Sequence, residues 1–191
     1  PLLRQSNVHL LVGLRLSITT FWGMASLILP LLIFRASDSA STAAFYASVS
    51  LACAAGGQLL TGLLRDRYGR TQPLLVSSTG VVVSALCLAF STESVPLLFV
   101  FGTALTTTAW AVSTLVPALI AEVATKAEKN RLVGLGHFVW STAMVTGSLL
   151  GGWWVEIDPA IPFGFGAVSA TIGTWCAWQL CRRLRNIETP D

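Results

Sequence analysis

Charge is densest in this sequence along Gly62-Leu63-Leu64-Arg65-Asp66-Arg67-Tyr68-Gly69-Arg70-Thr71. Asp66 lies among three arginines, and two glycines bracket the group. Long apolar segments precede and follow this stretch. Charged groups are costly to bury without partners. The pattern therefore predicts a short turn outside the apolar segments, whose charges hold neighbouring elements together.

The composition is that of an integral membrane protein. Of the 191 residues, 53% are hydrophobic and 11% charged, and the mean hydropathy is +0.69, whereas soluble domains carry about 25% charged residues. The net charge of +3 does not indicate a nucleic-acid partner. No metal or cofactor pattern occurs, so we expect neither. The cysteines lack zinc-ligand spacing and are expected to pack as small hydrophobes: Cys53, Cys87, Cys176 and Cys181.

Six apolar segments are long enough, or nearly so, to cross a bilayer core, which takes about 20 residues per helix. The third segment is the shortest and is interrupted by the run Ser77-Ser78-Thr79-Gly80, which leaves its ends the least defined. The prediction is one all-α membrane domain over residues 1–191. Its six transmembrane helices are expected at about 8–34, 40–64, 74–90, 95–121, 132–155 and 161–181.

Lysine and arginine are distributed unequally between the two ends of these segments. Ten of the twelve basic residues lie near the termini or in the second and fourth gaps. Cytoplasmic loops carry such an excess, so both termini are predicted to be cytoplasmic in a multi-pass protein of the plasma (inner) membrane. The residues on this side are Arg4, Arg65, Arg67, Arg70, Lys126, Lys129, Arg131, Arg182, Arg183 and Arg185.

The charged stretch resembles the signature loop of the major facilitator superfamily, which joins the second and third helices of those transporters. Arg65 and Thr71 depart from the usual small residue and lysine. The resemblance implies a conformational latch that stabilises the outward-facing state by joining two halves of the transporter. The positions in register are Gly62, Leu64, Asp66, Arg67, Gly69, Arg70 and Leu74.

Each residue type in this loop has a physical reason. Gly69 is expected to supply a positive φ for the turn. Asp66 is expected near a helix N-terminus, where a carboxylate is favoured. Arg67 and Arg70 are expected to hold carbonyls or carboxylates at neighbouring helix ends. The alternative is a basic cytoplasmic turn with an incidental aspartate.

Two later stretches carry the same resemblance. Glu122 and Arg131 flank the turn after the fourth segment and are expected to pair with neighbouring helix ends or with the arginines of the loop; an ordinary interfacial turn is the alternative. The fifth segment resembles the antiporter motif of drug–proton exchangers, although Ala143 and Ser148 replace a glycine and the proline. Its matching glycines are Gly134, Gly147, Gly151 and Gly152.

Small residues recur at a spacing of four on the second and fifth segments, which predicts that these helices form packing interfaces. The alternative is that the small residues only reduce side-chain volume in a crowded bundle and mark no particular interface. The two stripes are Ala44, Ser48, Ala52 and Gly56, and Ala143, Gly147 and Gly151.

The resemblance covers one half of a fold that usually has about twelve helices, built from inverted three-helix repeats. The implied fold is half of a major facilitator fold, more in keeping with the N-terminal half because the signature loop is best preserved there. A C-terminal half and a six-helix protein that dimerises are the alternatives. The expected partners are a small-molecule substrate, the lipid bilayer, and a second half of the same chain or a second copy.

The first and fourth helices of each half line the cavity in this superfamily. Arg15 is the one charge inside an apolar segment, and such residues are functional hypotheses by default; snorkelling to the headgroups is the alternative. The threonines among the candidates could instead form hydrogen bonds with the backbone of their own helix. The cavity candidates are Arg15, Thr20, Trp22, Thr103, Thr107 and Trp110.

The function implied is secondary transport of small molecules by alternating access, with drug or metabolite exchange for protons as one mode. No acidic residue lies inside the six segments, so an ion-independent facilitator is an alternative, as is a membrane scaffold or receptor with this fold. An enzyme is not expected. The sequence has only His9 and His137, and neither a Gly-x-Ser-x-Gly nor a His-Glu-x-x-His run.

Overall fold

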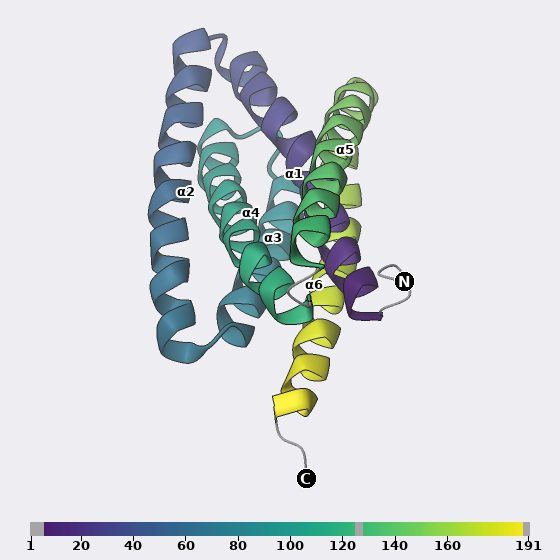
Figure 1. Ribbon diagram of the computed structural model, residues 1–191. Coiled ribbons are helices and arrows are strands. Elements are labelled where there is room, and N and C mark those ends of the chain that lie inside the picture. Colours follow the sequence, from purple (N-terminus) through teal and green to yellow (C-terminus); the bar gives the residue numbers. More distant parts are fainter. Residues whose placement is uncertain (1–5, 125–127, 189–191) are drawn as a thin grey trace.

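A computed structural model describes residues 6–124 and 128–188, and these residues form six α-helices and no strand (Figure 1). Where their connections are described, the helices are joined by short turns, and they run up and down the long direction of the molecule. Their bounds are α1 Ser6–Ser37, α2 Ala40–Tyr68, α3 Thr71–Ala89, α4 Val95–Val123, α5 Lys129–Val155 and α6 Ile161–Glu188.

Most of these helices extend beyond the apolar segments of the sequence. The charged ends continue the helical hydrogen bonding, so α2 includes Asp66 and α4 includes Glu122. α3 begins at Thr71 rather than at Leu74. Five helices are long and apolar enough to cross a membrane among the described residues, and α6 is the exception. Its length of 28 residues suffices, but glycine, serine, threonine and glutamine dilute its apolar run.

The contacts between helices have an internal symmetry. The most extensive ones join α1 to α5 and α6, α2 to α4, and α3 to α4 and α6. Exchanging α1 with α4, α2 with α5, and α3 with α6 maps this set of pairs onto itself. Two three-helix units that repeat one another produce this pattern, and such repeats are what the resemblance noted in the sequence implies.

The core lies along α1, which packs against four other helices. Its fully buried side chains include Phe21, Met24 and Ile28, and Phe163 of α6 is buried as well. The two outer helices, α2 and α5, bury far fewer residues. Both instead present large apolar side chains at the surface: Phe45, Leu51, Leu59, Leu60 and Leu63 on α2, and Phe138, Val145, Leu149 and Trp153 on α5.

Glycines bring α1 and α5 into backbone contact. A Cβ added to Gly147 would lie 2.1 Å from the carbonyl oxygen of Thr20, and one added to Gly151 would lie 2.9 Å from the Cα of Met24. Gly23 of α1 approaches the carbonyl oxygen of Met144 in the same way. The buried stripe on the fifth helix therefore forms an interface, as its spacing predicts.

The stripe predicted on the second helix forms no interface with the other described residues. Ala44, Ser48, Ala52 and Gly56 are all exposed, and nothing lies within 4 Å of a Cβ placed on Gly56. α2 turns a neighbouring face to the bundle instead. Tyr46 anchors that face, because its ring packs against Phe99 and its hydroxyl lies beside Gly102 of α4. The buried residues of α2 are Ala43, Tyr46, Ser50, Ala54 and Thr61.

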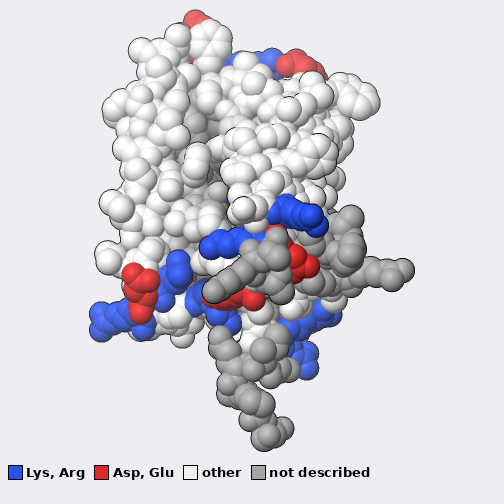
Figure 2. All heavy atoms as spheres, in the orientation of Figure 1, with Lys and Arg blue, Asp and Glu red and all other residues white. Residues whose placement is uncertain are grey.

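Charged side chains gather at the two ends of the molecule, and the middle of the face in Figure 2 is largely uncharged. At the end that carries the α1–α2 and α5–α6 turns, the Arg35 guanidinium lies 2.5 Å from the Glu156 carboxylate. The opposite end carries most of the basic residues seen in the figure. This distribution suits a protein whose middle lies in hydrocarbon.

Candidate functional site

The loop between α2 and α3 turns at Gly69, the one described glycine with a positive φ (75°). Only glycine adopts this conformation at no steric cost, and here it ends α2 so that α3 can begin at Thr71. The positive φ expected from the sequence is present. Arg70 follows directly at the N-cap of α3, where it points toward the end of α4.

An ion pair joins the loop to the second three-helix unit. The Arg70 guanidinium lies 2.6 Å from the Glu122 carboxylate, with 19% and 31% of the two side chains exposed. This contact connects the start of α3 to the last turn of α4. Glu122 therefore pairs with an arginine of the loop, as expected. Arg131 is exposed and has no ion pair within the described chain.

Asp66 lies in the last turn of α2 and is exposed. Its own helix presents a carbonyl end at this point, which does not favour a carboxylate. Among the described residues no ion pair involves Asp66. Arg67 is also exposed, and its guanidinium lies 5.3 Å from the ring centroid of Tyr68. The role of Asp66 and Arg67, like that of Gly62 and Leu64, stays a prediction.

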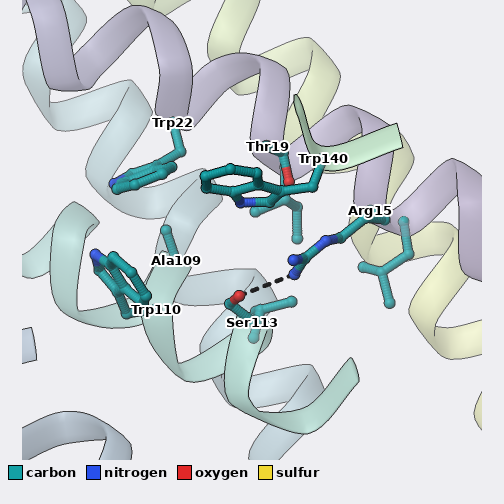
Figure 3. Close-up of a pocket in the computed structure, with 10 residues that line it drawn as sticks. Arg15, Thr19, Trp22, Ala109, Trp110, Ser113 and Trp140 are labelled. Carbon is teal, nitrogen blue, oxygen red and sulfur yellow. Dashed lines mark hydrogen bonds between the residues drawn. The ribbon is translucent and has the colours of Figure 1, made fainter. Parts of the chain in front are cut away.

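A recess lies between α1, α4 and α5 in the middle of the bundle (Figure 3). Arg15 of α1 reaches across it, and its Nη1 donates a hydrogen bond to the Ser113 hydroxyl of α4 at 2.8 Å. The side chain therefore points into the bundle rather than along α1 toward the membrane surface. This direction favours a role inside the bundle, which stays a prediction.

Three indole rings surround the same recess. Trp22 and Trp110 meet edge to face with centroids 5.2 Å apart, and Trp22 and Trp140 lie 6.5 Å apart at an angle of 34°. Each comes from a different helix, α1, α4 or α5. The enclosed volume is about 20 Å³, enough for about one water molecule. The recess as it stands is therefore smaller than an organic ligand.

Two polar groups of the recess have no partner. The Nε of Arg15 and the Nε1 of Trp110 are both buried without a hydrogen bond. The great majority of buried polar groups are paired, so exceptions that face a recess are typical of a ligand site. The Thr103 and Thr107 hydroxyls are unpaired as well, but these residues do not line the recess.

The structure brings together half of the cavity candidates. Arg15, Trp22 and Trp110 line the recess, whereas Thr20, Thr103 and Thr107 do not. The backbone of Thr20 faces Gly147, and the methyl group of Thr107 packs beside Gly57. The role of these threonines in a substrate cavity stays a prediction.

Sequence reasoning missed Trp140, which lines the recess together with Thr19 and Ser113 of the two helices expected there. A signal for Trp140 existed. It precedes the buried stripe Ala143, Gly147 and Gly151 at helical spacing, so extending that stripe by one turn leads to it.

The glycines of the motif predicted on α5 also fall into two groups, those that contact α1 and those that do not. Gly147 and Gly151 touch the backbone of α1, and the hydroxyl of Ser148, which stands where the motif has proline, donates to the Gly23 carbonyl at 3.2 Å. Gly152 faces the Leu27 side chain, and Gly134 has open space around it.

Three comparisons place this geometry among known proteins. Residues 11–189 match the sequence model of the Major Facilitator Superfamily. A class H tetracycline resistance protein from Pasteurella multocida is 29% identical over 113 residues, which are 59% of this chain and 28% of that protein. An auto inhibited POT family peptide transporter of known crystal structure is similar with a TM-score of 0.78 at 19% identity, over 94% of this chain and 38% of that one. The chain thus spans well under half of either relative.

The repeated three-helix units and the exposed apolar faces are those of a helical membrane protein. The chain belongs to the major facilitator superfamily. It is a multi-pass integral membrane protein, and its helices form half of that superfamily's fold. The fold class predicted from the sequence is confirmed.

Proposed function

We propose that the complete protein is a secondary transporter that moves a small molecule across the plasma membrane by alternating access. The recess carries this proposal, because it holds unpaired hydrogen-bond donors in the middle of an apolar bundle. Convergent polar groups in an apolar hollow are typical of ligand sites. Membership of the superfamily and the transporters among the similar proteins support the same function.

The proposal includes a second six-helix half that covers α2 and α5. These two helices correspond to one another in the symmetry of the contacts, and both present large apolar side chains. A second half placed against them would also close the recess. This chain would be the N-terminal half, with both termini cytoplasmic; a second copy of the chain is the alternative partner.

The loop between α2 and α3 would act as the latch between the halves. Arg70 is engaged with Glu122 inside this chain, whereas Asp66 is exposed and without an ion pair among the described residues. A carboxylate in this position can stabilise a helix N-terminus of the second half. Breaking and forming that contact would accompany the change between outward-facing and inward-facing states.

The mode of coupling can be exchange or facilitation. The glycine contact between α1 and α5 supports exchange through its likeness to the antiporter motif. No aspartate or glutamate lines the recess, so the carboxylate of a proton exchanger would come from the second half. A facilitator needs no such group.

The test is flux in liposomes that contain the complete protein. Uptake that rises with an imposed pH gradient supports exchange, and uptake that follows the substrate gradient alone supports facilitation. Asp66→Asn should lower flux about tenfold or more without reducing membrane insertion, because the loss of one charged hydrogen bond is worth about 1.5–3 kcal/mol. Asp38→Asn is the matched control, since Asp38 is an exposed aspartate at the other end of the bundle.

Normal flux in Asp66→Asn would contradict the latch. Absence of flux for any compound, in a protein that inserts and binds a protein partner, would favour the scaffold or receptor instead.

A further inference from the structure

We propose that the recess binds an organic anion with a flat aromatic body. Arg15 would contact the anionic group, and the indoles of Trp22, Trp110 and Trp140 would form the wall against which the ring packs, since the recess as it stands has room for about one water molecule. This inference rests on the proposed transport function and names the class of substrate that it carries. Four observations support it, concerning charge, hydrogen-bond donors, ring geometry and access.

The charge of Arg15 is not neutralised within the described chain. Its hydrogen-bond partner is the neutral hydroxyl of Ser113. No aspartate or glutamate lines the recess or the two other cavities that also reach Arg15. A partly buried cation without a counter-ion is unfavourable. An anionic ligand would supply the missing charge, whereas a cationic ligand would add to the repulsion.

The unpaired groups of the recess can donate and cannot accept. The guanidinium Nε of Arg15 and the indole Nε1 of Trp110 are both buried without partners, and neither side chain has an acceptor atom. A carboxylate, sulfonate or phosphate group offers several acceptor oxygens at once. The donors come from α1 and α4, so one anionic group between them would connect both three-helix units.

The indoles favour a flat, aromatic body. Figure 3 shows Trp22 and Trp140 on one side of the recess and Trp110 on the other, with Arg15 beside them. The edge-to-face contact at 5.2 Å and the tilted contact at 6.5 Å leave ring surfaces of different orientation around one space. Aromatic ligands pack on such surfaces by stacking and edge contacts.

Access from the basic end leads past Arg15. A second cavity of about 100 Å³ shares Arg15 and Ser113 with the recess. Its other walls include Val133 and His137, close to the start of α5. Arg15 thus stands between this cavity and the indoles, where it would meet the charged group of an entering anion before the ring reaches them.

Arg15 could instead pair with an acid from the second half and serve as a gate. The two roles predict different preferences for the charge of the ligand. A gate residue leaves the charge of the substrate undetermined, whereas a recognition residue makes an anion bind more tightly than the matching cation.

The test uses the complete protein in lipid nanodiscs and three probes of similar size. These are 2-naphthoate, its cationic analogue 2-naphthylmethylammonium, and the saturated bicyclic anion decahydronaphthalene-2-carboxylate. Binding is measured by calorimetry and by quenching of tryptophan fluorescence. We expect 2-naphthoate to bind at least about tenfold more tightly than either other probe, because only it matches both the charge and the rings.

Variants assign the effect to the recess. Arg15→Gln should weaken 2-naphthoate binding about tenfold or more, and Arg15→Lys should retain part of it, because the charge remains while the Nε donor is lost. Trp110→Phe should weaken it several-fold. The matched controls are Arg35→Gln and Trp175→Phe, which change an arginine and a tryptophan outside the recess. They should bind as the unmodified protein does.

Two results would overturn the inference. One is tighter binding of the cation than of 2-naphthoate, and the other is unchanged 2-naphthoate binding in both Arg15→Gln and Trp110→Phe. Liposome flux separates this inference from the proposed function. If only the cationic probe is transported, the proposed transport function is supported and the inferred class of substrate is overturned. Arg15-dependent binding of 2-naphthoate without flux of any probe supports the site and contradicts transport.

Discussion

Gly147 lies where two helix backbones are closest. A Cβ at this position would lie 2.1 Å from the Thr20 carbonyl oxygen, and main-chain atoms cannot rotate away as a side chain can. Gly134 lies on the same helix and in the same motif, yet has nothing within 4 Å of its added Cβ. The spacing of the glycines therefore does not tell which of them is required for packing.

Gly147→Ala should destabilise the protein by about 1–3 kcal/mol, the usual range for overpacking. Gly134→Ala should be neutral or stabilising by up to about 1 kcal/mol, because alanine is the better helix former. Thermal unfolding in detergent, or unfolding in mixed SDS micelles, measures both. Equal stability of the two variants would contradict the close approach of α1 and α5.

At the scale of the helices, two ion pairs at opposite ends connect different elements. Arg70–Glu122 connects α3 to α4 and Arg35–Glu156 connects α1 to α5. The first is the more buried, with 19% and 31% of the side chains exposed against 44% and 61%. Water and salt screen an exposed pair more strongly than a partly buried one.

A double-mutant cycle should rank the two pairs in that order. Combining Arg70→Gln with Glu122→Gln should give a coupling of about 1 kcal/mol, and combining Arg35→Gln with Glu156→Gln about 0.5 kcal/mol or less. The free energy of unfolding in mixed micelles is measured for the unmodified protein, the two single variants and the double variant of each pair. A larger coupling for Arg35–Glu156 would show that burial does not set the strength of these pairs.

At the scale of the whole molecule, the unequal distribution of charge predicts an orientation. With the native cysteines replaced by serine, a cysteine at Thr71 should react with a membrane-impermeant thiol reagent only from the cytoplasm, because basic loops remain on that side. Glu93→Cys, at the opposite end, should react only from outside. Labelling of the Thr71→Cys variant in intact cells would overturn the orientation.

The sequence by itself determined the class of fold. Apolar length, helical spacing and the left-handed conformation at Gly69 depend on residues close together in the chain, so local chemistry was enough to predict six helices and the turn after α2. The glycine stripe on α5 belongs here as well, because its spacing alone placed it on one face.

Only the tertiary structure decided which faces meet. The rotation of α2 buried Tyr46 and left the predicted stripe exposed, and neighbouring helices covered Thr103 and Thr107. Arg15 and Ser113 are 98 residues apart in the chain, and Trp140 joins them from a third helix. Such contacts depend on how whole helices rotate and approach one another, a collective result of packing that no local pattern contains.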